Sequence, residues 1–328
     1  MIPKNHCHAA QAVGVVTLAA ALLASGCASK SNKAKTSSGA GSSTTSSAAA
    51  PSTAASAASG SAMASPSADS ALAGMLPASV KSAGTITIAA DASYAPNEFF
   101  DKDGKTIIGM DVDLGNAIAA KLGVKAKFQN ATFDAIIPGL AAGKYALGMS
   151  SFTDTKEREK TVDFVTYFSA GESLIVPKGN PKNITGPDLS LCGLTIAVEK
   201  GTTEESEIPA LSKKCTAAGK QGVTALSTDD QNGANLALTS GRAQVGSADS
   251  PVAEYAVKQL NGAVQIAGQS YETAPYGIAI PKNDGQFPQA IQGALKDLIA
   301  DGTYKAILNK WGIASGAIDN PQINGATS

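Results

Sequence analysis

The chain has 328 residues, which is enough for one large or two medium domains. Its net charge of −1 excludes the basic footprint of a nucleic-acid-binding protein and the polybasic attraction of a protein to a membrane surface. The organisation along the chain therefore carries the functional information.

The N-terminus reads as an export signal. An apolar run over 12–23 follows Lys4 and is too short to span a bilayer, which is typical of a signal peptide. The residues up to Cys27 resemble a bacterial lipobox, although Ala24 stands where leucine is more common. We predict a lipoprotein signal peptide over 1–26 and a lipidated Cys27. The alternative is a signal peptide that is cleaved to release a soluble protein.

Residues 27–75 are predicted to form a disordered tether. Most of this stretch is serine, alanine, threonine and glycine, so its apolar area is too small to offset the entropy of ordering.

The cysteines and histidines agree with export. Once the signal peptide and the lipid-bearing residue are set aside, Cys192 and Cys215 remain, and in an oxidising compartment they are predicted to form a disulfide. Two buried free thiols are the alternative. His6 and His8 would leave with the signal, which removes histidine-dependent nucleophilic catalysis and the usual zinc sites. We expect no metal and, without a nucleotide-binding glycine motif, no cofactor.

Strands and helices alternate from residue 85 onward. Strand 85–90 ends just before Asp91, and apolar residues at helical spacing follow from Met110 to Leu122. Strand 124–128, helix 133–142 and strand 145–149 come next. This alternation predicts a parallel α/β sheet.

The same rhythm restarts at strand 194–198. It continues with a helix after Thr203, strand 223–226, helix 229–240, strand 243–247 and a helix from Ser250. Apolar segments 174–176 and 277–280 separate the two units, which suggests two lobes joined by two crossing strands. Helices are predicted at 287–300 and 303–311.

The segment from Ser150 to Arg158 is the most informative motif. Asp154 with Glu157 three residues later has the form of a capping box, which predicts a helix with an anion-binding N-terminus. Arg158 lies in that first turn, where the helix dipole disfavours a cation. A carboxylate partner would explain it. The alternative is a solvated surface arginine.

This motif, followed by Val162-Asp163-Phe164, resembles the signature of family 3 solute-binding proteins, the amino-acid receptors of ABC importers. The likeness runs from about Gly84 to Trp311 and includes the segments at 91–96, 109–114, 135–140, 201–203, 249–251, 276–279 and 302–311. It implies two Rossmann-like lobes joined by a two-strand hinge, the type II periplasmic-binding-protein fold. Lobe 1 would comprise 76–175 plus 276–318, lobe 2 would comprise 176–275, and 319–328 would be a C-terminal tail.

Ligands of open α/β sheets bind beyond the carboxyl ends of the strands. The resemblance implies that Arg158, Thr153 and the Thr203 backbone hold an α-carboxylate and that Asp249 holds an α-ammonium group. The predicted binding residues are Asp91, Tyr94, Phe133, Ser150, Ser151, Thr153, Arg158, Glu199, Thr202, Thr203 and Asp249. As alternatives, Asp249 could serve as a turn residue, and Thr202 and Thr203 could serve only as a helix cap.

The residues expected around the ligand side chain favour a cation. Tyr94 and Phe133 match aromatic positions of the family, and Asp91 and Glu199 add negative charge. A basic side chain is favoured and an amide is possible. Ordinary core packing of the aromatics is the alternative. Asn97, where relatives often carry phenylalanine, weakens any close transfer of substrate.

We therefore expect a monomeric, membrane-tethered extracytoplasmic protein that binds an amino acid and passes it to an ABC permease without catalysing a reaction. One alternative is a dehydratase-like enzyme on the same fold with carboxylates in its cleft. Another is a sensory lipoprotein with no transporter partner.

Overall fold

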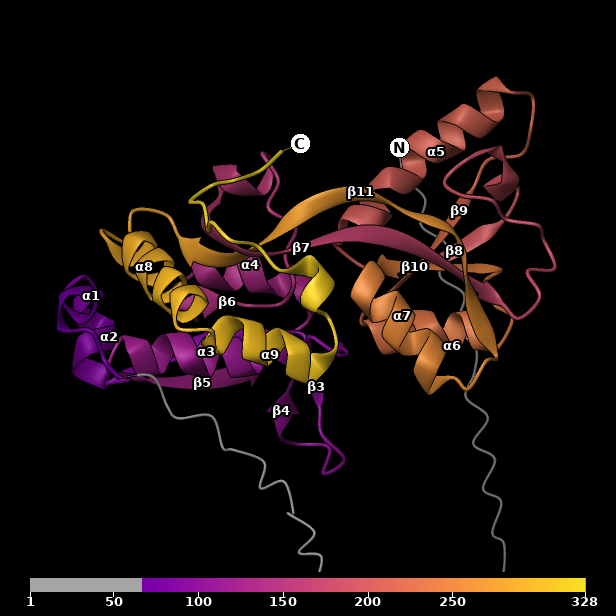
Figure 1. The fold of residues 1–328 in the computed structure, drawn as a ribbon. Coiled ribbons are helices and arrows are strands. Elements are labelled where there is room, and N and C mark those ends of the chain that lie inside the picture. The colour runs from indigo at the N-terminus through magenta and orange to yellow at the C-terminus, as the bar shows by residue number, and fades with distance from the viewer. Residues whose placement is uncertain (1–66, 328) are drawn as a thin grey trace, which may run out of the picture. The chain divides into compact units, whose positions relative to one another are not determined.

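Residues 67–327 are described by a computed structural model of the chain (Figure 1). The predicted signal peptide, Cys27 and most of the predicted tether lie outside the described residues. Within the described part, no helix is both long enough and apolar enough to cross a membrane.

The predicted tether extends too far toward the C-terminus. Helix α1 (Ser70–Gly74) forms inside the range 27–75, and Asp69 caps it by accepting hydrogen bonds from two backbone amides at 2.8 and 3.0 Å. Leu72 then packs against helix α8 (Phe287–Ala300). This contact was not predicted because the mean composition of residues 27–75 does not show that one leucine, Leu72, packs on a distant helix.

Half of the fold is built around strand β1. Its strands are β1 (Thr85–Ala90), β2 (Ser93–Tyr94), β3 (Glu98–Phe100), β4 (Ile107–Ile108), β5 (Lys125–Asn130) and β6 (Leu147–Gly148). Its helices are α1, α2 (Ala78–Ala83), α3 (Met110–Lys121), α4 (Phe133–Ala141) and the 3₁₀ helix η1 (Arg158–Lys160). Two C-terminal helices, α8 and α9 (Thr303–Trp311), and the 3₁₀ helix η3 (Ala314–Gly316) complete it. We call this half the first lobe.

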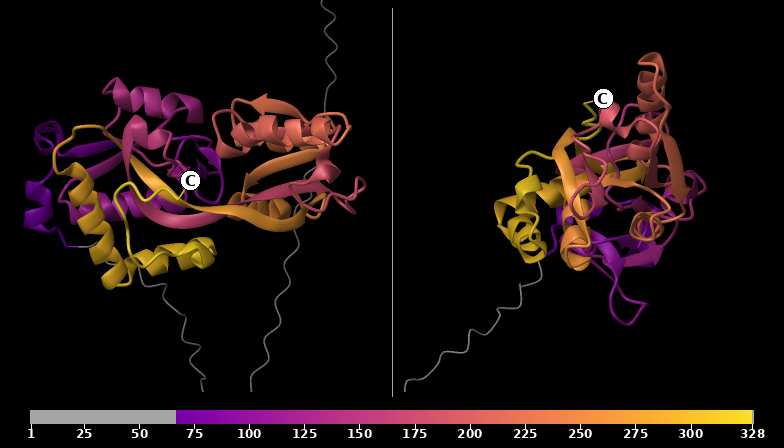
Figure 2. Two further views of the ribbon diagram at one scale, coloured as in Figure 1. Left: turned by 90° about the horizontal axis from the view of Figure 1, so that it is seen from above. Right: turned by 90° about the vertical axis from the view of Figure 1, so that its right-hand side faces the viewer.

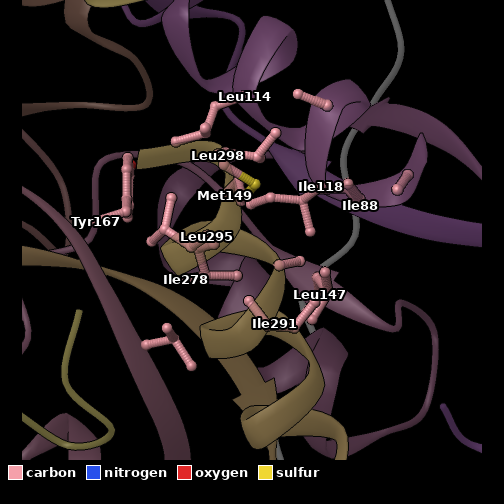
Figure 3. Close-up of a cluster of buried hydrophobic side chains, with 14 of the residues drawn as sticks. Ile88, Leu114, Ile118, Leu147, Met149, Tyr167, Ile278, Ile291, Leu295 and Leu298 are labelled. Atoms are coloured by element: carbon pink, nitrogen blue, oxygen red, sulfur yellow. The ribbon is translucent and has the colours of Figure 1, made fainter. Parts of the chain in front are cut away.

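The core of the first lobe joins segments that are far apart in the sequence (Figure 3). Leu114 and Ile118, which have helical spacing on α3, are buried in one cluster with Leu295 and Leu298 of α8. Helix α9 also packs on α3. The C-terminal helices therefore complete and stabilise the first lobe, whose other elements come before residue 170 in the sequence.

The second lobe repeats the pattern around strand β8. It contains η2 (Leu189–Leu191), β8 (Thr195–Glu199), α5 (Thr203–Ala217), β9 (Thr224–Thr228), α6 (Gln231–Thr239), β10 (Val245–Asp249) and α7 (Ser250–Gln259). Its largest apolar cluster includes Leu174, Ile196, Ile208 and Cys215. The predicted disulfide between Cys192 and Cys215 is present and ties the segment after η2 to helix α5.

Two long antiparallel strands connect the lobes (Figures 1 and 2). Strands β7 (Val162–Pro177) and β11 (Val264–Pro281) contain the two segments predicted to cross between lobes. They pass through the middle of one eight-stranded sheet with the order β5-β1-β6-β11-β7-β10-β8-β9. Strands β5, β1 and β6 are parallel to one another, as are β10, β8 and β9. The predicted two-lobed α/β fold class is confirmed.

Two local predictions near residue 150 are wrong. The strand predicted over 145–149 is reduced to β6, and the helix predicted after Asp154 is only the single turn η1. Asp154 does not cap that turn, because its side chain accepts a hydrogen bond from Gly325 N at 2.8 Å. The C-terminal segment that contains Gly325 is paired with β7, so a distant backbone amide displaces the local cap.

Candidate ligand-binding site

The ends of four strands meet around one pocket. Asp91 follows β1, Ser150 lies two residues after β6, and Glu199 and Asp249 are the last residues of β8 and β10. The residues lining this ligand pocket are Asp91, Tyr94, Phe133, Ser150, Ser151, Thr153, Arg158, Glu199, Thr202, Thr203, Glu204 and Asp249. All eleven residues predicted from the sequence are therefore brought together, together with Glu204. Their role in binding stays a prediction.

Aromatic rings of the first lobe hold the Arg158 guanidinium. Phe133 and Phe152 stack with their ring centroids 4.4 Å apart, and the guanidinium carbon lies 5.4 and 5.5 Å from the two centroids. Cation–π attraction of this kind favours a desolvated cation over the ring faces. Arg158 is thus held at the pocket wall, and the predicted alternative of a solvated surface arginine does not describe it.

The guanidinium already bridges the two lobes. Its Nη1 donates to Thr153 O at 2.8 Å, and its Nη2 donates to Gly201 O of the second lobe at 2.9 Å. Arginine has five N–H donors, so donors remain that are not used by these two bonds. They are the donors that a ligand carboxylate could accept from.

The helix N-terminus that reaches the pocket belongs to α5. Thr202 caps this helix, because its Oγ1 accepts a hydrogen bond from Glu205 N at 3.2 Å, and Thr203 is the first helical residue. The two interpretations of Thr202, as a helix cap and as a pocket residue, therefore hold together. Free N–H groups at such a terminus attract anions.

Direct contacts between the lobes close the pocket. Tyr94 Oη donates to Asp249 Oδ2 at 2.8 Å and accepts from Asp249 N at 3.0 Å. Lys200 of the second lobe pairs with Asp134 of the first at 2.6 Å. The space left for water between the lining residues is about 10 Å³, which is room for roughly one water molecule. An amino acid can enter only if these contacts separate.

The pocket has an excess of carboxyl groups over cationic groups. Asp91, Glu199, Glu204 and Asp249 are all buried, and among the lining residues of the described chain Arg158 alone is cationic. Burial, with the charge of Asp91 adding to it, raises the pKa of Glu199 to about 10. Burial and the charge of Glu204 raise the pKa of Asp249 well above its ordinary value. A cationic group would relieve both effects.

Two carboxyl oxygens in this pocket lack a partner. Oε1 of Glu199 and Oε1 of Glu204 are buried without a hydrogen bond to any described residue. Buried polar atoms are normally paired, so these oxygens are positions where a donor of a ligand would be favoured. Glu204 was missed by the sequence reasoning. Its place immediately after Thr203, in the first turn of α5, is the signal that could have found it.

A buried polar cluster supports the serine turn behind the pocket. Ser151 has a left-handed φ of 52°, which is costly for a residue other than glycine. Its backbone N donates to Asp111 Oδ2 at 3.1 Å, and its Oγ donates to Glu98 Oε2 at 3.2 Å. Asn97 Nδ2 donates to the same Ser151 Oγ at 2.9 Å. Asn97 therefore belongs to the support of this turn and does not line the pocket.

No described group of three or more His, Cys, Asp or Glu residues is arranged to hold a metal ion.

Residues 86–314 match the model of bacterial extracellular solute-binding proteins, family 3. The arginine-binding protein ArgT of Corynebacterium glutamicum is 36% identical over 251 residues, which cover 76% of this chain and 81% of that protein.

Two solved structures extend the comparison. An ancestral arginine-binding protein bound to arginine is 38% identical with a TM-score of 0.65, and the match covers 70% of this chain and 98% of that one. An ancestral amino acid-binding protein described as a precursor of cyclohexadienyl dehydratase is 34% identical with a TM-score of 0.64, and the match covers 71% and 97%.

Proposed function

Because the chain belongs to the bacterial extracellular solute-binding proteins of family 3, we propose that it binds a free amino acid with a cationic side chain in the ligand pocket. We propose further that it delivers this amino acid to the permease of an ABC importer. The lobes that close on the ligand are residues 76–175 with 276–318, and residues 176–275.

The two ends of the amino acid meet different lobes. The α-carboxylate lies against the unused N–H donors of Arg158 and the N-terminus of α5 at Thr203, because both attract an anion. The α-ammonium group lies against Asp249. The side chain of the amino acid extends toward Asp91 and Glu199. A cation there is stabilised by these carboxyl groups and by the aromatic rings of the first lobe.

The observation that carries the choice of a cationic side chain is the charge of the pocket. Four buried carboxyl groups face one guanidinium, and a cationic side chain is the ligand group that would favour ionisation of a carboxyl whose pKa is raised, such as that of Glu199. The names of the similar proteins agree, since the relative from Corynebacterium glutamicum and one ancestral protein are both called arginine-binding. An amide side chain is the second choice, because its donors could still reach Glu199 Oε1.

Binding works by stabilising one arrangement of the lobes over another. The contacts between Tyr94 and Asp249 and between Lys200 and Asp134 hold the lobes together in this structure. A ligand that contacts both lobes can shift the equilibrium only by its difference in affinity for the closed and open states. A micromolar dissociation constant corresponds to about −8 kcal/mol, a magnitude within reach of one buried zwitterion and one cation.

The permease partner and the membrane attachment complete the proposal. The family is extracellular, and we propose that the protein acts as a monomer that is anchored through a lipid on Cys27 after removal of residues 1–26. Pull-down of a permease from solubilised membranes would separate this role from that of a sensory lipoprotein. Incorporation of a labelled fatty acid, lost in Cys27→Ala, would test the anchor.

The test of binding is a calorimetric titration of the mature protein with arginine, lysine, ornithine, glutamine and glutamate. We expect saturable binding of at least one basic amino acid, and loss of that binding in Arg158→Ala. Arg242→Ala is the matched control, because Arg242 is exposed and does not line the pocket. Binding of glutamate in preference to all basic amino acids would refute the proposal.

We propose that the chain catalyses no reaction. The similarity to a protein described as a dehydratase precursor is the reason to test one enzymatic alternative. A dicarboxylic substrate, however, would require more cationic groups than this pocket offers. Turnover of prephenate by the purified protein, abolished in Glu199→Gln, would decide for the enzyme.

A further inference from the structure

A second cavity in the second lobe is lined by residues of helix α5. It shares only Glu204 with the ligand pocket. The space left for water in this cavity is about 220 Å³, compared with about 10 Å³ in the ligand pocket. We call it the α5 cavity. It has room for a small molecule without any movement of the two lobes.

The inner wall of the α5 cavity is apolar. It is formed by side chains of the second-lobe core, namely Leu174, Leu191, Ile196, Ile208 and Leu211. The remaining wall carries Glu204, Glu207, Ser247, Tyr271 and Glu272, together with the exposed Lys214. A mainly apolar lining with a few polar groups on one side is the usual composition of a small-molecule site.

Two buried polar atoms of this wall have no partner. Glu204 and Ser247 are each only 4% exposed, and neither Glu204 Oε1 nor Ser247 Oγ forms a hydrogen bond with a described residue. A buried carboxylate oxygen that lacks a donor is costly, so a donor supplied from the cavity would be favoured.

The charge of the wall selects the donor. Glu204, Glu207 and Glu272 outnumber the single cation Lys214. Glu172 is buried close to Glu207, and the charges of Glu204 and Glu207 add to the effect of burial in raising the pKa of Glu172 to about 10. Carboxyl groups are therefore in excess over cationic groups on this side of α5, in addition to the carboxyl groups at Asp91, Glu199 and Asp249.

We propose that the α5 cavity is a second ligand site that binds a primary alkylammonium ion, with the ammonium group on the carboxylates and the alkyl stem on the apolar wall. An ammonium group has three donors, enough to satisfy Glu204 and Ser247 and to pair with Glu207. The stem gains from burial against the leucine and isoleucine side chains. The site requires neither Arg158 nor an α-carboxylate.

The test uses n-butylammonium as the probe in calorimetric titrations of the full-length mature protein. We expect saturable binding to the wild type. We expect the double variant Glu207→Gln/Glu272→Gln to bind the probe about tenfold more weakly, because two partly exposed charge interactions are removed. The same variant should bind its amino acid unchanged, since neither glutamate lines the ligand pocket. Lys214→Met should tighten binding of the probe, because Lys214 is a competing cation.

Two controls locate the site. Uncharged n-butanol should not bind, and Asp91→Asn should bind n-butylammonium as the wild type does, because Asp91 lines the ligand pocket and not the α5 cavity. The proposal is overturned if n-butylammonium shows no saturable binding, if the double variant binds it as tightly as the wild type does, or if Asp91→Asn loses it. Failure of the proposed amino-acid binding would leave these measurements interpretable, because they contain no amino acid.

Discussion

Replacing Glu199 by glutamine should make the protein more stable at neutral pH and weaken its binding of basic amino acids. The Glu199 side chain is 2% exposed, and burial raises its pKa from 4.5 to about 10. Because the pKa of Glu199 is higher in the folded state than in the unfolded state, its contribution to the free energy of unfolding is fully present below pH 4.5 and is lost as the pH rises toward 10. Glutamine has the shape of the protonated carboxyl group and does not titrate.

The expected magnitude follows from the pKa difference. Between pH 4.5 and pH 7 the unfolded chain ionises Glu199 and the folded chain does not, which favours unfolding by about 3 kcal/mol at about 1.4 kcal/mol per pH unit. Glu199→Gln should remove this penalty, which corresponds to a rise in Tm of about 5–10 °C for a chain of this size. The difference should vanish near pH 4, where both states are protonated.

The assay is thermal and urea unfolding of wild type and variant between pH 4 and pH 9 without amino acid. Glu254→Gln is the control, because Glu254 is an exposed glutamate outside the ligand pocket. The reasoning is refuted if Glu199→Gln is less stable than the wild type at pH 7, or if the gap between them does not grow with pH. Titration of Glu199→Gln with arginine should give a dissociation constant about tenfold higher than that of the wild type, since one desolvated charge partner is lost.

Further outcomes follow from the same contacts. Arginine should bind more tightly at pH 8.5 than at pH 7, because its cation favours the ionised form of Glu199. Calorimetry in buffers of different ionisation enthalpy should register the release of a proton on binding. Equal affinity at both pH values would contradict this prediction. Tyr94→Phe should lower the free energy of unfolding by about 1–3 kcal/mol, because Asp249 loses a buried donor; urea unfolding without a change would show that this bond contributes nothing. Cys192→Ser/Cys215→Ser should cost about 3 kcal/mol of stability by the loop-entropy estimate for a separation of 23 residues, and an unchanged urea midpoint would refute it.

Much of the pocket could be predicted because several of its residues lie at the ends of predicted strands. Asp91, Glu199 and Asp249 each end or follow a buried strand, and such positions converge at one edge of a parallel sheet. Their grouping therefore depended on recognising short strands in the sequence and not on knowledge of the packing. The family resemblance supplied what the pattern lacked, namely which strand ends face one another across two lobes.

The prediction failed where a long-range contact replaced a local one. The sequence around Asp154 has the form of a capping box, yet its carboxylate bonds to Gly325, more than a hundred and fifty residues away, and only the turn η1 remains. Leu72 likewise docks on α8 from within a stretch that has the composition of a tether. Local preferences are worth about 1 kcal/mol and yield to buried tertiary contacts of similar or greater strength.

The amino-acid sequence by itself determined the alternation of strands and helices, the choice of Cys192 and Cys215 as the candidate disulfide pair, and the set of chemical groups available to a ligand, because these depend on periodicity and on residue type. Only the tertiary structure decided how those groups are used. It placed Glu204 between two cavities, joined Tyr94 to Asp249 across the cleft, and left particular carboxyl oxygens without donors. The physical reason is that desolvation and pairing depend on which atoms from distant segments come within bonding distance, and no local pattern encodes that distance.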